Sequence, residues 1–159
     1  MPEAGGAEQR TIGTLRALIL SVLLIGMLGT LAELYLLEHT EGWWQLAPMC
    51  LLAAGSLAVV WSMIKLAPAS LHSLQALMVL YVLAGVIGTY QHYAGNAEFE
   101  LEMYPSRAGF ELFWESLKGA TPTLVPGTMT MFGLLGLASI FRHPQLASKE
   151  RRMEALRRS

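Results

Sequence analysis

The chain has 159 residues, a length that suits one domain; 53% of them are hydrophobic and only 14% are charged, against roughly 25% charged in soluble domains. The formal net charge is −1, and all the acidic residues are Glu. The single cysteine, Cys50, excludes an internal disulfide, and the sequence contains no P-loop, dinucleotide fingerprint or nucleophile elbow. This composition favours an integral membrane protein.

Four apolar segments follow one another along the chain, at about 17–37, 43–66, 71–93 and 124–142. Each has about 20 residues, the length of helix that crosses the roughly 30 Å hydrocarbon core of a bilayer. Polar, Gly- and Pro-containing stretches separate them, and "AGNAEFELEMYPS" is predicted to end the third. The sequence therefore predicts an all-α integral membrane protein, with four transmembrane helices within residues 17–142.

A cleaved signal peptide is an alternative interpretation of the first segment. Arg10 and Arg16 precede the apolar run, and "TLA", which ends at Ala32, resembles a cleavage site. The apolar run continues beyond that point to Leu37, which favours a membrane helix.

The third loop is predicted to contain a short amphipathic helix at about 107–118. Ser106 is placed to cap its start and Gly119 to end it. One apolar face of this helix results from an i, i+3, i+4, i+7 pattern of Phe110, Phe113, Trp114 and Leu117. Such a helix lies on the outer membrane surface or forms a lid over the helix bundle.

The basic residues predict the orientation. Nine of the eleven Lys and Arg residues lie in the N-terminal tail (1–16), in the second loop, or at the end of the fourth segment and in the C-terminal tail (143–159). By the positive-inside rule both termini are cytoplasmic, and a bacterial inner membrane fits this pattern. The basic C-terminal tail suits contact with anionic lipid headgroups, and no motif favours nucleic acid.

Two similar phrases, "GMLGTLAE" and "GVIGTYQH", occur near the outer ends of the first and third segments. Small residues spaced in this way let membrane helices approach closely. The predicted helix-packing residues are Gly26, Gly29, Thr30, Gly85, Gly88 and Thr89. The second and fourth segments also echo each other, in "LAPMCLLAAG" and "LVPGTMTMFG". We interpret the pattern as an internal repeat of two tandem hairpins, with chance similarity as the alternative.

Each phrase ends in an ionisable residue, Glu33 or His92. On the inner faces of membrane helices such residues indicate a functional site, here an outer cavity whose candidate ligand-binding residues are Glu33, His92, His39 and Glu38. Glu33, His92 and His39 are the candidate ligands for a metal ion such as Zn, Fe, Mn or Cu. Alternatively Glu33 and His92 pair with each other or are hydrated. Haem is disfavoured, because three of the four His lie at shallow helix ends.

Two functions remain open. The first is a non-catalytic accessory or assembly subunit of a membrane complex, with lipid and a membrane-protein partner or a second copy as its contacts. The second is a binding or transfer protein whose outer-leaflet Glu/His site takes a metal ion, a quinone or another small ligand. The sequence identifies no catalytic residue, so the pattern does not favour an enzyme.

Overall fold

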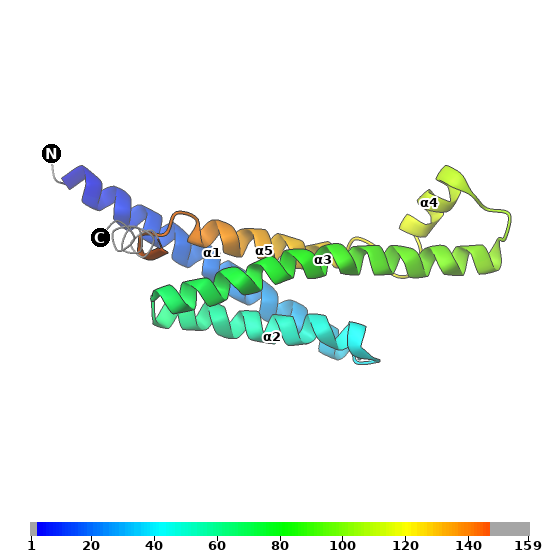
Figure 1. The fold of residues 1–159 in the computed structure, drawn as a ribbon, viewed down its shortest axis with the longest axis horizontal. Helices are drawn as coiled ribbons and strands as arrows, with labels where there is room; N and C mark the ends of the chain where they lie inside the picture. Colours follow the sequence, from blue (N-terminus) through cyan, green and yellow to red (C-terminus); the bar gives the residue numbers. More distant parts are fainter. Residues whose placement is uncertain (1–2, 147–159) are drawn as a thin grey trace, which may run out of the picture. The chain divides into compact units, whose positions relative to one another are not determined.

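The computed structural model describes residues 3–146, and every regular element over that range is a helix (Figure 1). The helices are α1 (Glu3–Leu36), α2 (Trp43–Ile64), α3 (Pro68–Met103), α4 (Gly109–Leu117) and α5 (Gly127–Ile140). The prediction of an all-helical fold is confirmed for this part of the chain. Most of the basic tail, from residue 147 on, lies outside the described residues.

Three helices, α1, α2 and α3, are long and apolar enough to cross a membrane. α5 is apolar too, but its 14 residues rise only about 21 Å. The four residues before it, 123–126, form turns instead, with Val125 N–H donating to the Pro122 carbonyl at 3.3 Å. The structure thus supports a membrane protein with at least three apolar helices of spanning length, and a fourth crossing needs residues on both sides of α5.

Two helices extend beyond their predicted limits. α1 begins at Glu3 rather than near residue 17, and α3 continues to Met103. The predicted end of α3 near Tyr93 is wrong. Gly95 and Asn96 are weak helix formers, but the Asn96 side chain bonds to another segment instead of competing for its own backbone. The helix therefore passes through both residues.

The described chain divides into two compact units, and α3 and α5 each contribute to both. The first unit contains the residues up to Leu80 and those from Phe132 on. In it α1 and α2 pack against each other and are joined by a short loop, residues 37–42. Its most deeply buried apolar side chains are Leu23, Met27, Leu52, Val59, Leu71, Leu74 and Met78.

The second unit spans residues 81–131. Its α4 folds back beside the last turns of α3 (Figure 1). α4 confirms the short helix expected in the third loop, but the predicted cap is wrong. The N-cap is Ala108, in an extended conformation and without a side-chain cap. Gly109 follows with φ 59°, so Ser106 stands two residues too early for its hydroxyl to reach the first turn.

Candidate functional site

The C-terminal part of α3 carries three polar residues, His92, Asn96 and Glu100, at i, i+4 and i+8. This spacing places them on one side of the helix. Each bonds to the segment that runs from the end of α3 to the start of α5. The polar side of α3 therefore holds α4 and its flanking loops in place.

Asn96 is the centre of this arrangement and is only 4% exposed. Its side-chain N–H₂ group lies 3.0 Å from the Ser116 carbonyl, 2.7 Å from the Thr121 carbonyl and 3.1 Å from the Thr123 hydroxyl. Its side-chain oxygen accepts a hydrogen bond from Thr121 N–H at 3.1 Å. The buried amide thus has partners for both its donor and its acceptor groups, as a stable buried polar group requires.

His92, one turn earlier on α3, lies with Nδ1 2.9 Å from the Pro122 carbonyl oxygen. A carbonyl oxygen only accepts, so Nδ1 carries the proton in this contact. In the neutral ring Nε2 is then the nitrogen with a free lone pair, able to accept a hydrogen bond or to bind a metal ion. His92 is half-buried, so this orientation is fixed at the edge of the unit.

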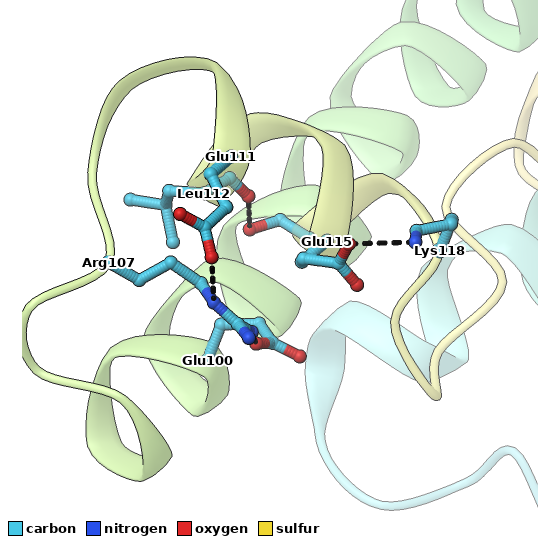
Figure 2. A network of polar contacts seen from close by, with 7 residues as sticks. Glu100, Arg107, Glu111, Leu112, Glu115 and Lys118 are labelled. Carbon is cyan, nitrogen blue, oxygen red and sulfur yellow. Dashed lines mark hydrogen bonds and ion pairs between the residues drawn. The ribbon is translucent and has the colours of Figure 1, made fainter.

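Arg107 joins the last turn of α3 to the first turn of α4, as Figure 2 shows. Its guanidinium contacts the carboxylates of Glu100 and Glu111, and it also lies 4.1 Å from the centre of the Tyr104 ring. Farther along α4, Lys118 donates to Glu115 at 2.8 Å, and this hydrogen bond lowers the pKa of the Glu115 carboxyl. The acidic third loop is therefore partly neutralised by its own basic residues.

The predicted packing residues differ in what they meet. A Cβ at Gly85 would lie 2.6 Å from the backbone nitrogen of Thr130, and one at Gly88 would lie 2.8 Å from Pro126 Cβ. At Gly26 the nearest atom would be Phe132 Cε1, at 2.8 Å, whereas Gly29 has nothing within 4 Å. The two threonines of the stripes, Thr30 and Thr89, are half-buried, and Thr89 bonds back to the Gly85 carbonyl at 2.9 Å.

The other candidate ligands, Glu33, Glu38 and His39, lie around the end of α1. Glu33 is exposed and His39 is half-buried. Glu38 has φ 52° and helps to line a hollow of about 310 Å³, with Tyr35, Leu36 and Thr40. Glu33 and His92 belong to different units, so their shared cavity stays a prediction. Over residues 3–146, no three His, Cys, Asp or Glu side chains gather as a metal-binding group.

A further contact joins residues near the two ends of the chain: Arg16 of α1 donates to the Phe141 carbonyl at 2.9 Å. This carbonyl belongs to the C-terminal end of α5, where a cation is favourable. His143 beside it is buried, and burial, followed by the nearby Arg16 charge, lowers the pKa of its imidazole. The sequence identified these residues only as charge or turn signals.

Sequence reasoning missed Asn96 and the bridging role of Arg107. The signal for Asn96 was present, because His92, Asn96 and Glu100 recur at the spacing of one helix face. It was hidden by the interpretation of "AGNAEFELEMYPS" as a helix end. Arg107 left no comparable signal, since its partners depend on how the chain turns after Met103.

The sequence matches no protein-family model, and searches of curated proteins and of solved structures give no significant match. Function is therefore inferred from the residues and contacts of this chain.

Proposed function

We propose that the protein is a small polytopic membrane protein that acts as a non-catalytic accessory or assembly subunit of a membrane complex. The observation that carries this proposal is the exposed apolar surface of the long helices. Only 17% of the most apolar window of α1 is buried within the chain, and the values for α2 and α3 are 33% and 28%. Lipid covers part of such a surface, and helices of a partner cover the rest.

Within this proposal the chain crosses the membrane four times, as two tandem hairpins with cytoplasmic termini. The packing of α1 on α2 supports the first hairpin. The close approach of Gly85 and Gly88 to residues 126–130 supports the second. Residues 124–126 and Phe141 lengthen the apolar segment around α5 enough to reach both interfaces.

The polar groups of the second unit support a structural role. Among the described residues, no buried side-chain nitrogen or oxygen lacks a hydrogen-bond partner. Asn96 and Arg107 each join α3 to the segment that follows it. A network that satisfies itself rigidifies the hairpin and presents its outer surface to another molecule.

The test is purification of the tagged chain from its native membrane in mild detergent, followed by cross-linking and mass spectrometry. We expect one or a few membrane proteins in a fixed ratio to the chain. Gly29→Leu should release the partner without unfolding the chain, because a Cβ at this position meets nothing within 4 Å in the chain itself. Val22→Leu, an exposed apolar change on the same helix, is the control. A chain that purifies alone contradicts the proposal.

The second candidate is a binding or transfer protein with a Glu33/His92 site, and the orientation of His92 favours it. Imidazoles that bind metal ions donate their other N–H to a carbonyl or carboxylate, as Nδ1 does toward Pro122. Elemental analysis and mass spectrometry of the purified chain test this candidate. A stoichiometric metal ion or small ligand that Glu33→Gln or His92→Gln removes supports it, and a chain free of both contradicts it.

A further inference from the structure

α4 has three sides of different chemistry. One side faces the protein: Ser116 is fully buried and its carbonyl bonds to Asn96 of α3, and Leu112, one turn earlier, is half-buried. A second side carries the charged residues Glu111, Glu115 and Lys118. The third side is aromatic, with Phe110 76% exposed, Phe113 44% and Trp114 47%. One side of this short helix therefore packs on the protein, and a second is suited to contact with water. The third is apolar, and its exposure to water is unfavourable.

The aromatic residues make one continuous surface. Phe110 lies 6.1 Å from Phe113 and 6.3 Å from Trp114, measured between ring centres. Phe113 also packs against Tyr93 of α3 at 5.9 Å. We define the aromatic side of α4 as Phe110, Phe113 and Trp114. Through Phe113 it is continuous with Tyr93 of α3.

Tyr93 also ends an apolar side of α3. Val86 and Tyr90 precede it at i−7 and i−3 and are 60% and 69% exposed. This spacing puts the three residues on one side of α3, away from the glycines that meet Pro126 and Thr130. α3 is one of the helices able to span the membrane, so this side faces lipid as the helix approaches the interface. The aromatic side of α4 continues that lipid-facing surface.

We propose that the aromatic side of α4 is a membrane anchor, seated in the headgroup region of the leaflet from which α3 emerges. Trp, Tyr and Phe suit this depth, where apolar rings enter the acyl boundary and polar atoms stay hydrated. Lys118 lies 5.8 Å from the centre of the Trp114 ring, close enough to reach lipid phosphates. The anchor fixes the tilt of the α3–α4 hairpin, and it does not depend on a partner subunit.

Charge and continuity with α3 together favour lipid over a protein partner as the molecule that covers the aromatic side of α4. The aromatic side carries no charged residue of its own, and the exposed carboxylate of Glu111 lies on the water-facing side. A zwitterionic surface accepts such a helix without charge matching. Continuity with the lipid-facing side of α3 then favours the bilayer.

The test uses the full chain in phosphatidylcholine vesicles with Trp114 as the only tryptophan, after Trp43→Phe, Trp44→Phe and Trp61→Phe. Lipids brominated near the headgroup end of the acyl chain should quench Trp114 fluorescence more than lipids brominated near the chain end. The emission should also be blue-shifted from that of tryptophan in water. A second chain that carries Phe110→Trp with the other four tryptophans replaced should behave in the same way.

The matched control is Glu111→Trp in a chain whose four native tryptophans are Phe. This position is one residue from Phe110 but on the water-facing side, so its fluorescence should be quenched little. Unquenched fluorescence at both aromatic positions would overturn the proposal and leave this surface to a protein partner. Equal quenching at positions 111 and 114 would also overturn it, because the helix would then have no preferred side. The vesicles contain no partner, so these outcomes are independent of the accessory role.

Discussion

The Asn96 side chain of α3 donates a hydrogen bond of 3.0 Å to the carbonyl oxygen of Ser116 in the last turn of α4. Carbonyls in the last turn of a helix have no partner within the helix. The Gly119 N–H reaches the same oxygen only at 3.4 Å, so Asn96 adds a shorter, long-range hydrogen bond at this helix end. The same amide reaches Thr121 and Thr123 in the loop toward α5, so one side chain fixes the end of α4 and the start of the next connection.

Asn96→Ala should loosen this region, because it removes the hydrogen bonds of the amide to Ser116 and Thr123 and leaves the Thr121 N–H and carbonyl without their side-chain partner. Each hydrogen bond within a protein contributes about 0.5–1.5 kcal/mol net, so the loss of several should lower the stability by about 1–3 kcal/mol. Hydrogen exchange, read by mass spectrometry, should become faster across residues 112–123. Glu98→Ala changes an exposed residue on the same helix and should leave exchange there unchanged. Equal exchange in the two variants would show that Asn96 does not hold α4.

The sequence predicts the helices better than it predicts their ends. Apolar runs identify the part of a helix that lipid can cover, but helices continue into polar segments such as "AEFELEM", most of whose residues are good helix formers. The contacts of Asn96 depend on a chain reversal between Met103 and Gly109, and no local pattern specifies its geometry. The glycine stripes illustrate the same limit, since Gly26 and Gly29 have identical sequence signals and only Gly26 meets another helix.

Gly85→Ala should destabilise the chain, whereas Gly29→Ala should not. A methyl group at Gly85 would lie 2.6 Å from Thr130 N and 2.9 Å from the Pro126 carbonyl, and backbone atoms cannot move aside as a flexible side chain does. Overpacking of this kind costs about 1–3 kcal/mol. At Gly29 the methyl group meets nothing within the chain, and alanine favours the helix by about 0.5–1 kcal/mol. Thermal unfolding in one detergent compares the two variants directly, and the opposite order would reject the contact at Gly85.

The proposed topology predicts which positions an impermeant thiol reagent reaches in intact cells. In a Cys50→Ser background, a cysteine at exposed Ser106 should react, and a cysteine at Ser148, in the tail beyond the described residues, should not. In this proposed topology the basic residues retain both tails in the cytoplasm, and the third loop lies outside. Reaction at both positions would exclude an even number of crossings with cytoplasmic termini.

Stability should depend on His143 at mildly acidic pH. Burial, then the Arg16 charge, lowers the pKa of His143 in the folded chain below its ordinary value of 6.5. As the pH falls, the unfolded chain therefore binds the proton before the folded chain does. The free energy of unfolding should fall as the pH drops from 6.5 toward the lowered pKa, and it should stay at its full value above pH 6.5. His143→Gln should flatten this part of the curve, measured by thermal unfolding between pH 7.5 and pH 5. His72→Gln, at an exposed residue, is the control. A parent curve and a His143→Gln curve that run parallel would reject the assignment.

The predicted Glu33/His92 site can be tested without knowing its ligand. The variants are Glu33→Gln, His92→Gln and the double change, each measured for stability in the same detergent. Residues that share a site, directly or through a ligand, show an interaction energy of about 0.5–3 kcal/mol, whereas independent residues add within about 0.3–0.5 kcal/mol. His92→Gln alone should be destabilising in either case, because it disturbs the bond to the Pro122 carbonyl, so only the coupling is informative. A bound ligand gives a second observable result. The stabilisation of the parent chain should grow with the ligand concentration, and this stabilisation should be absent in both single variants. Additive changes with no such concentration dependence would falsify the shared site and leave His92 as a residue that positions the loop before α5.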